Sequence, residues 1–384
     1  MFSNFIYHNP VKVLFGKGQI AQLPKQIPAE AKIMLTYGGG SIMQNGVYEQ
    51  TKAALAGRNI VEFGGIEANP TYETLMKGVA IARAEKIDFL LSVGGGSVLD
   101  GTKFMAAAIP FEGADPWDIL ANKARIKTAV PIGAILTLPA TGSEMNYFAV
   151  ISRTSTQEKK GMGHPLVYPV FSILDPETTF SLPERQIANG IADAFTHTLE
   201  QYLTYPVGAL LQDRMAESVL QTLLEVGPTT MAHPTDYDAR ASMMWAATVA
   251  LNGWISVGVP QDWATHQIGH ELTALHGIDH ARTLAIVMPH LLHVKRDSKR
   301  EKLIQMAKRV WNLSGTDDEL VEGAIQGVTQ FYETLGIPTR AKTYGIGADT
   351  VEEVRKRFVA RNLNFGEKAD ITPDVVVEIL NLSI

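Results

Sequence analysis

Histidine is dense in one short segment of the chain. Four of the ten histidines, His266, His270, His276 and His280, lie within the sixteen residues HQIGHELTALHGIDHA. Imidazole is the commonest metal ligand in proteins and titrates near neutral pH. Residues four apart share a helix face, and Gly277 is expected to end the helix before His280. The cluster therefore favours a metal or proton-transfer site over isolated histidines.

A second pair lies upstream, in the sequence DAFTH from Asp193 to His197. Asp193, His197, His266 and His280 would together supply three imidazoles and one carboxylate. This donor set suits Zn²⁺ or Fe²⁺, whereas Ca²⁺ and Mg²⁺ prefer oxygen ligands. The zinc-protease motif H-E-x-x-H is absent here, because His270 and Glu271 are followed by LTA.

Glycine turns follow two apolar segments that have the character of buried strands. The first ends residues 32–37 and contains Gly38, Gly39, Gly40 and Ser41. In a dinucleotide-binding fold, an acid at this place would hold the ribose hydroxyls of NAD. No acid occurs between residues 37 and 41, so glycine amides and the serine hydroxyl can donate to a 2′-phosphate instead. This turn predicts a preference for NADP(H).

The second turn, GGGS at 94–97, ends the apolar segment 88–93 and precedes an expected helix over 98–109. Glycine lets a backbone approach a ligand closely, and the first amides of a helix attract anions such as a diphosphate. The turn is neither the G-x-G-x-x-G fingerprint nor a Walker A loop, so a tight turn without a ligand remains the alternative. LPATGSE at 138–144 adds hydroxyl groups after a further expected strand.

Composition excludes several classes of protein. The 384 residues contain no cysteine, which rules out a thiolate nucleophile, Cys-ligated zinc and iron–sulfur clusters, and which favours the cytoplasm. The net charge of −6 gives no electrostatic basis for binding nucleic acid or an anionic membrane. Neither a signal peptide nor an apolar run of about 18 residues is present.

The pattern of elements changes along the chain and predicts two domains. Residues 1–183 are expected to form an α/β domain with a mainly parallel sheet, and residues 184–384 an all-helical domain. The expected strands are 32–37, 60–63, 88–93, 131–136 and 170–174. The expected helices are 71–86, 98–109, 184–203, 210–226, 238–254 and 299–310.

Four motifs resemble the iron-containing (group III) alcohol dehydrogenase family. They are GGGSVLDGTK, LPATGSE, NGIADAFTH and VPQDWATHQIGHELTALHGIDHA. The sequence is similar over its whole length, and most of all to the NADPH-dependent butanol dehydrogenase and aldehyde reductase branch. The resemblance implies a dehydroquinate synthase-like fold, with a nucleotide-binding α/β domain, a helical metal domain, a cleft between them and a homodimer.

The resemblance also implies roles for individual residues. The metal ligands would be Asp193, His197, His266 and His280, and His270 would relay a proton near the nicotinamide. The implied nucleotide contacts are Gly95, Gly96, Ser97, Asp100, Thr137, Leu138, Thr141, Lys159 and Leu182. The register at Lys159 is ambiguous, because Lys160 is adjacent. His276 falls outside the ligand pattern.

The implied activity is hydride transfer between NADPH and a short-chain aldehyde such as butanal, with the carbonyl polarised by Fe²⁺ or Zn²⁺. One alternative is a lyase of the same fold that pairs NAD with a metal. It needs several basic residues near the metal, where the sequence offers Arg282 and little else. Another alternative is a non-catalytic metal- or nucleotide-binding protein. Covalent oxidation of aldehydes would need a cysteine nucleophile, which the chain lacks.

Overall fold

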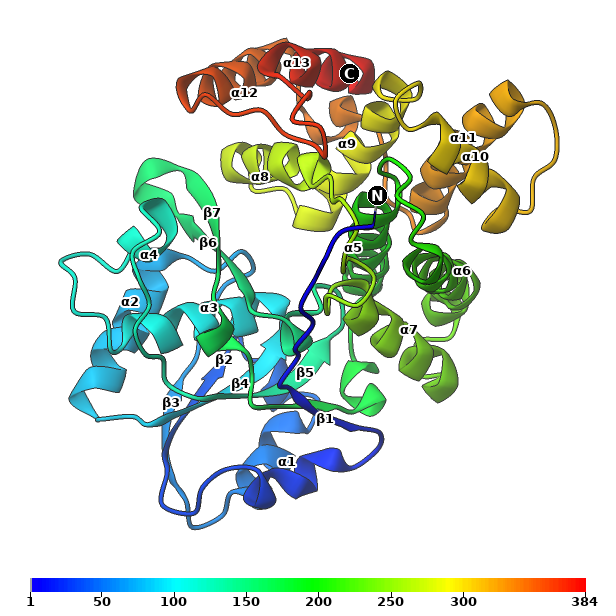
Figure 1. The fold of residues 1–384 in the computed structure, drawn as a ribbon. Helices are drawn as coiled ribbons and strands as arrows, with labels where there is room; N and C mark the ends of the chain where they lie inside the picture. The colour runs from blue at the N-terminus through cyan, green and yellow to red at the C-terminus, as the bar shows by residue number, and fades with distance from the viewer. Residues whose placement is uncertain (1) are drawn as a thin grey trace. The chain divides into compact units, whose positions relative to one another are not determined.

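The computed structural model describes residues 2–384 (Figure 1). The chain groups into two compact units. One unit contains residues 8–183 and 234–248, and the other contains residues 2–7, 184–233 and 249–384. Most of helix α7 (Tyr237–Ala250) thus packs with the α/β unit although helices surround it in the sequence. The domain boundary after residue 183 stays a prediction.

A six-stranded parallel sheet forms the centre of the α/β unit, with strand order β1-β8-β5-β4-β2-β3. The strands are β1 (Lys12–Phe15), β2 (Lys32–Tyr37), β3 (Asn59–Phe63), β4 (Phe89–Gly95), β5 (Ile132–Leu138) and β8 (Phe171–Leu174). The predicted parallel α/β architecture is confirmed. Because β4 lies between β2 and β5, the turns that follow these three strands share one edge of the sheet. Nucleotides bind at such an edge, where the strand order reverses.

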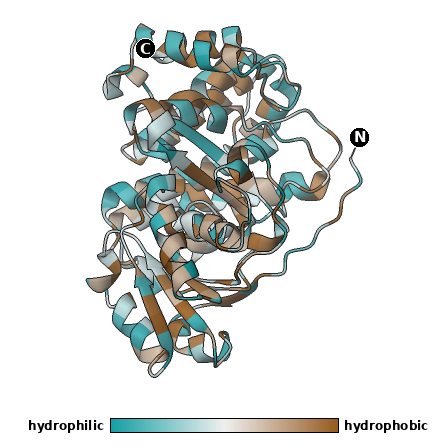
Figure 2. Ribbon diagram, turned by 90° about the vertical axis from the view of Figure 1, so that its left-hand side faces the viewer, coloured by the Kyte–Doolittle hydropathy of each residue, from teal (hydrophilic) through white to brown (hydrophobic). Residues whose placement is uncertain are grey.

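Alternating side chains explain why both faces of this sheet are covered. Met34 packs into a core with α2 (Tyr72–Ala84) and α3 (Gly96–Ala108), whereas Ile33 and Leu35 face a second core beside α1 (Val47–Ala54). Successive residues of a strand point to opposite faces, so strands buried on both sides are apolar throughout. Figure 2 shows the strands of the sheet largely in the hydrophobic colour.

Strands β6 (Phe148–Arg153) and β7 (Glu158–Gly163) form a separate antiparallel hairpin, which the sequence analysis did not predict. The short helix α4 (Asp118–Ala121) packs against β7. Glu73 of α2 accepts hydrogen bonds from the N–H groups of Thr154 (3.2 Å) and Ser155 (3.1 Å) in the connection between the two strands. Burial alone would raise the pKa of Glu73, but hydrogen bonds from its own backbone N–H and from those of Ser155 and Thr154 lower it to about 2.

We expect Glu73→Gln to destabilise the protein at pH 7 by about 1 kcal/mol. This value is about the usual contribution of a charge-assisted hydrogen bond, reduced because Glu73 is partly exposed to solvent. The pKa of Glu73 is depressed from its ordinary 4.5, so its contribution is complete above that pH and disappears as the pH falls toward 2. Urea unfolding of parent and variant between pH 7 and pH 3 checks this. Glu49→Gln, at an exposed position of α1, is the control. A stability difference that grows on acidification would contradict the expectation.

The helical unit combines amphipathic helices with a first helix that is buried on all sides from residue 187 to 202, and Figure 2 shows polar and apolar colours mixed along its ribbons. The helices are α5 (Glu184–Tyr202), α6 (Leu210–Ala232), α8 (Ala264–His276), α9 (His280–Val294), α10 (Arg300–Arg309), α11 (Asp317–Thr334), α12 (Ala348–Ala360) and α13 (Pro373–Ser383). Helix α5 packs against α6 and α9, and α8 packs against α9 and α12. Gly277 ends α8 in the left-handed conformation (φ 67°), as predicted. Among the described residues, none of the helices has the length and apolarity that crossing a membrane requires.

Candidate metal centre and nucleotide-binding turns

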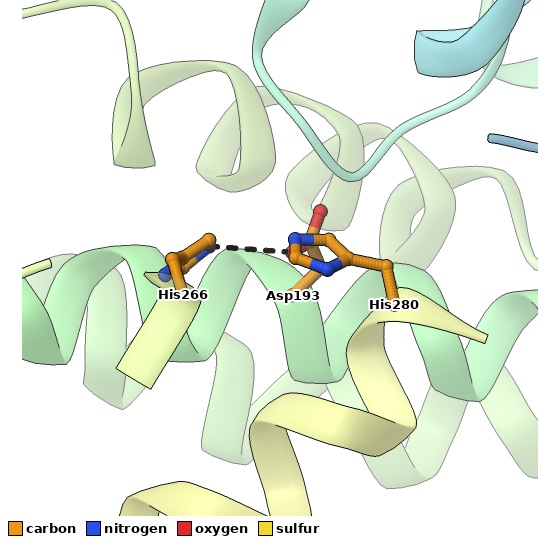
Figure 3. Close-up of side chains that lie close together, drawn as sticks. All are labelled: Asp193, His266 and His280. Atoms are coloured by element: carbon orange, nitrogen blue, oxygen red, sulfur yellow. Dashed lines mark ion pairs between the residues drawn. The ribbon is translucent and has the colours of Figure 1, made fainter. Parts of the chain in front are cut away.

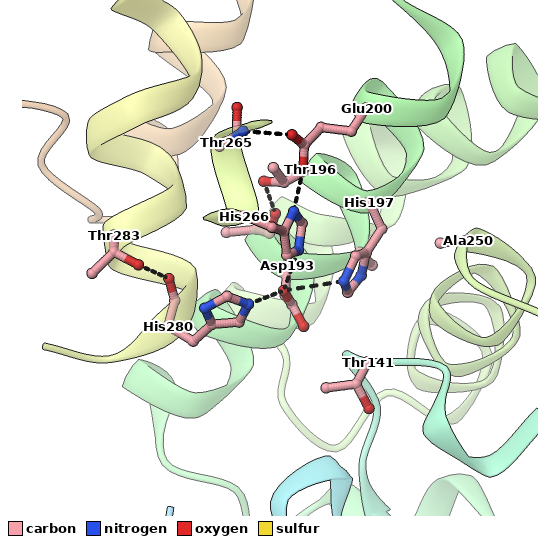
Figure 4. Close-up of polar contacts among 12 residues, drawn as sticks. Thr141, Asp193, Thr196, His197, Glu200, Ala250, Thr265, His266, His280 and Thr283 are labelled. Atoms are coloured by element: carbon pink, nitrogen blue, oxygen red, sulfur yellow. Dashed lines mark hydrogen bonds and ion pairs between the residues drawn. The ribbon is translucent and has the colours of Figure 1, made fainter. Parts of the chain in front are cut away.

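Three helices of the helical unit bring the predicted ligands together. Asp193 lies on α5, His266 lies on α8, and His280 is the first residue of α9 (Figure 3). His197 lies one turn from Asp193 on α5 (Figure 4). The Oδ1 atom of Asp193 is 3.7 Å from His197 Nε2, 4.0 Å from His266 Nε2 and 3.9 Å from His280 Nε2. All three imidazoles therefore face Asp193, and the potential ligand atoms of Asp193, His266 and His280 lie within 4.8 Å of one another, whereas His197 approaches this group through Asp193.

The chemistry of this cluster fits a divalent transition metal. Asp193 Oδ1 is buried and accepts no hydrogen bond from the described residues. Ligand atoms that each lie about 2.1 Å from one tetrahedral ion are about 3.4 Å apart, close to the distances seen here. A buried carboxylate facing three imidazoles at more than hydrogen-bonding distance is costly unless a cation compensates it.

Glu200 is a part of the centre that the sequence analysis missed. It lies on α5, and its Oε1 accepts the N–H of Thr265 at 2.7 Å while its Oε2 contacts His266 Nδ1 (Figure 4). Burial, followed by the nearby charge of Asp262, raises the pKa of Glu200 well above its ordinary value. The spacing i, i+4, i+7 of Asp193, His197 and Glu200 along one helix face was the available signal.

His270 lies beside the cluster and not among the contacts of Asp193. Its ring centroid is 6.3 Å from that of His266 and 5.2 Å from that of His280. It is half-buried. His276 lies at the last position of α8, where its Nε2 is 2.9 Å from Thr350 Oγ1. The structure thus distinguishes one histidine adjacent to the ligands from one that contacts α12.

Two arginines, Arg185 and Arg282, lie beside Asp279, the residue before His280. The sequence alone pointed only to Arg282. Asp279 accepts hydrogen bonds from Arg185 Nε (2.7 Å) and Asn189 Nδ2 (2.8 Å), and Arg282 Nε is 3.7 Å from the same carboxylate. Both guanidinium groups therefore have an acidic partner, which leaves little positive charge for a phosphorylated substrate.

In the α/β unit, the turns after β4 and β5 pack closely together. A Cβ atom at Gly96 would lie 2.3 Å from Thr141 Oγ1, and one at Gly95 would lie 2.9 Å from Leu138 Cβ. Only glycine therefore fits at these positions. This contact unites four of the predicted nucleotide-binding residues at the start of α3, where the N-cap residue Gly95 provides no side-chain hydrogen bond. The first amides of α3 face the edge where a diphosphate would bind.

The turn after β2 has a different character. Gly40 requires glycine because its φ is +98°, whereas a Cβ atom at Gly39 would meet no atom within 4 Å. Gly39 and Ser41 are exposed and Gly38 is half-buried. One carboxylate lies on the neighbouring strand, but Glu62 is engaged by Lys52 Nζ at 2.9 Å. The turn itself thus offers open space beside amide and hydroxyl donors.

Lys159, rather than Lys160, is directed to the glycine turn. Its Nζ donates to Asn69 Oδ1 at 2.8 Å, and the N–H of Asn69 donates to Ser97 Oγ at 3.3 Å. Lys160 pairs instead with Glu158 at 2.8 Å. The hairpin thereby brings a cation to Ser97 through Asn69.

Asp100 is held by the protein itself. Its Oδ1 accepts from Ser143 Oγ at 2.7 Å and its Oδ2 from the N–H of Val150 at 2.9 Å. Lys103, which the sequence analysis missed although GGGSVLDGTK contains it, donates from Nζ to Ser143 Oγ (2.8 Å) and Asn146 Oδ1 (3.1 Å). Burial lowers the pKa of Lys103 to about 7. This buried network fixes the segment after β5 against α3.

The last two predicted contacts lie at the ends of elements. Thr137 is buried and is the residue before the last of strand β5. Leu182 is half-buried, and its N–H donates to the carbonyl oxygen of Thr179 at 3.1 Å. The neighbouring Ser181 Oγ accepts from Asn45 Nδ2 at 3.3 Å, which connects this segment to the loop after β2.

Comparison with known proteins gives a consistent result. Residues 10–176 match the family model described as iron-containing alcohol dehydrogenase, and residues 187–384 match the C-terminal model of the same family. The chain is 54% identical over 377 residues to the NADPH-dependent aldehyde reductase YqhD of Escherichia coli strain K12, with 97% of each sequence covered. It is 38% identical to the NADH-dependent butanol dehydrogenase A of Clostridium acetobutylicum, with 99% of each covered.

The crystal structure of Escherichia coli K-12 YqhD matches this structure with a TM-score of 0.98 at 53% identity, covering 100% of this chain and 99% of that chain. The resemblance seen in the sequence motifs is therefore confirmed, together with the fold class. With both family models matched and relatives similar along almost the whole sequence, the chain belongs to the iron-containing alcohol dehydrogenase family.

Proposed function

We propose that this protein is a metal- and NADP(H)-dependent alcohol dehydrogenase that reduces short-chain aldehydes such as butanal. The observation that carries the proposal is the buried Asp193 Oδ1, with three imidazole nitrogens between 3.7 and 4.0 Å away. The similarity to an NADPH-dependent aldehyde reductase at 54% identity supports the substrate class and the cofactor.

Asp193, His197, His266 and His280 are the proposed ligands of one Fe²⁺ or Zn²⁺ ion. When bound there, the ion would polarise the carbonyl of the aldehyde as a Lewis acid. The protein contributes the fixed arrangement of the donors on three helices and the burial of Asp193, His197 and His266. Burial strengthens every electrostatic interaction at the site, because it lowers the effective dielectric constant.

The glycine turns and Lys159 are the proposed nucleotide site. The amides at the start of α3 would hold the diphosphate, and Gly38, Gly39, Gly40 and Ser41 would receive the 2′-phosphate of NADP(H). NADPH would supply the hydride. Asp100, Thr137, Leu138, Thr141 and Leu182 complete the proposed set. Because a relative at 38% identity is NADH-dependent, cofactor preference varies within the family, and we assign it here to the turn after β2.

We assign to His270 the transfer of a proton to the alkoxide oxygen. We expect His270→Ala to retain the ion, to lower kcat by about 10²–10⁴-fold and to alter the pH profile, because a general acid is lost. Elemental analysis and kcat over a pH series check this, with His276→Ala as the control on the same helix. If His270→Ala loses its ion as completely as a ligand variant, His270 is a ligand and this role is wrong.

Two other functions are less well supported. A lyase that handles a phosphorylated substrate would need unpaired basic groups near the ligands, but Arg185 and Arg282 both face Asp279. A non-catalytic binding protein would show no turnover. Purified protein with butanal and NADPH separates the three, because only the proposed enzyme consumes NADPH in an aldehyde-dependent manner.

Assembly and location are also proposals. Strand β1 is an edge of the sheet, and such an edge offers unpaired backbone groups to a second copy of the chain. We therefore propose a homodimer. Sedimentation equilibrium would measure its mass. The absence of cysteine is consistent with the proposed cytoplasmic location.

A further inference from the structure

We propose that Glu200 is a positioning residue of the metal centre, which acts through His266 by fixing the orientation and tautomer of that imidazole. The inference rests on the proposed function, because it assumes that His266 is a ligand. It extends the site by one carboxylate that has no direct contact with the point where Asp193, His197 and His280 converge.

The geometry gives Glu200 two anchors at the start of α8. Its Oε1 accepts the N–H of Thr265 at 2.7 Å, and its Oε2 contacts Nδ1 of the next residue, His266 (Figure 4). The carboxylate is 3% exposed, so water does not compete for these contacts. The imidazole of His266 cannot rotate about its Cβ–Cγ bond without breaking the contact at Nδ1.

The tautomer follows from the same contact. A carboxylate accepts hydrogen bonds and cannot donate them, so it favours a proton on His266 Nδ1. The opposite nitrogen, Nε2, is then free of a proton and lies 4.0 Å from Asp193 Oδ1. Metal-bound histidines commonly donate their other N–H to a carboxylate, which orients the ring and increases its basicity.

A buried ionic network holds Glu200 in place. The N–H of Asp262 donates to the backbone oxygen of Glu200 at 2.9 Å, and Asp262 Oδ1 accepts the N–H of Ala264 at the start of α8. Lys299, 1% exposed at its side chain, donates to Asp262 Oδ2 at 2.6 Å and to Glu367. Helices α5 and α8 are thereby fixed to each other where Glu200 meets His266.

The surroundings of Glu200 and a cation at the centre act on its charge in opposite directions. Burial raises the pKa of Glu200, which favours the neutral acid when no cation is near. A divalent ion bound beside His266 would favour the ionised carboxylate, because charges are weakly screened in buried surroundings. The contact between Glu200 and His266 would then be that of a carboxylate with an imidazole N–H.

Glu200→Gln tests the proposal with little change of shape. The glutamine oxygen can still accept the N–H of Thr265, but its NH₂ group would donate to His266 Nδ1. That contact would shift the proton to Nε2, the nitrogen that faces Asp193, where it would compete with the ion. We expect Co²⁺ to bind 10- to 100-fold more weakly to the metal-free variant than to the metal-free parent, at about the scale typical of such outer contacts.

The measurement is the Kd for Co²⁺ by competition with a chromophoric chelator, together with the absorption spectrum of bound Co²⁺ and the Tm of the metal-free proteins. Glu217→Gln is the matched control: Glu217 is a buried glutamate of the same helical unit that accepts from Tyr202 Oη at 2.9 Å. We expect it to change the Tm without changing the Kd or the spectrum. A merely structural Glu200 would behave in the same way.

The outcomes separate this inference from the proposed function. If the parent binds Co²⁺, His266→Ala abolishes binding, and Glu200→Gln binds as tightly as the parent, then Glu200 has no positioning role while the metal centre stands. If His266→Ala binds Co²⁺ as the parent does, the metal centre itself is wrong and the inference falls with it. Weaker binding by Glu200→Gln with an unchanged Tm and an altered spectrum supports the proposal.

Discussion

His266→Ala should remove the bound ion and lower kcat/KM for aldehyde reduction by at least about 100-fold, the factor expected when about 3 kcal/mol of transition-state stabilisation is lost. His266 lies between Asp193 Oδ1, at 4.0 Å, and Glu200, so its loss removes one ligand and leaves the buried Glu200 carboxylate without its imidazole partner. Elemental analysis of the purified variant and the rate of NADPH consumption with butanal measure the two effects.

His276→Ala is the matched control for this prediction. It removes a histidine from the same helix, but one whose Nε2 lies 2.9 Å from Thr350 Oγ1 and not at the metal centre. We expect it to retain about one ion per chain and most of the activity. Loss of the ion from the His276 variant alone would show that the ligands were assigned to the wrong histidine.

Gly39→Asp should reverse the cofactor preference of the parent. We expect the parent to use NADPH about 10- to 10³-fold better than NADH, because a charge-assisted hydrogen bond to the 2′-phosphate contributes about 1.5–3 kcal/mol and a second would add part of that amount. A Cβ atom at Gly39 would meet nothing within 4 Å, so the aspartate fits without displacing other groups. Its carboxylate would repel the phosphate and accept hydrogen bonds from ribose hydroxyls.

The measurement for Gly39→Asp is kcat/KM with both cofactors and one aldehyde. Gly39→Asn is the control, because it adds a side chain of similar size without the charge. We expect the asparagine variant to lose part of the NADPH preference and the aspartate variant to prefer NADH. Equal or better use of NADH by the parent would mean that the turn after β2 does not select the phosphate.

Much of the fold followed from the sequence because local patterns carry it. Strands β2 and β4 are mostly apolar and buried over nearly their whole length, as expected of strands covered on both faces. The hairpin of β6 and β7 escaped prediction because β7, EKKGMG, is polar and only partly buried. Helices α11 to α13 fall in the region predicted to be all-helical, but their bounds were not predicted, although Thr316 forms a capping box at the start of α11.

The four ligands were predictable because two pairs of them follow helical spacing or a helix break, and the donor set has a defined chemistry. Helical spacing places Glu200 on the same face as Asp193 and His197, but the roles of Glu200 and Lys103 depend on partners far along the chain. Glu200 meets His266 across 66 positions, and Lys103 reaches Ser143 across 40. Such contacts arise only when the helices and loops have packed, so residue types and spacing alone do not reveal them.

The most direct test of the proposed function is the rate of butanal-dependent NADPH consumption by one preparation in three states. The protein is assayed as purified, after its ion has been removed by a chelator, and after Zn²⁺ or Fe²⁺ has been restored. We predict that activity is lost on removal and recovered on restoration with about one ion per chain, as expected of a single site built on Asp193 and three histidines. Undiminished activity in protein that elemental analysis finds free of metal would contradict the account.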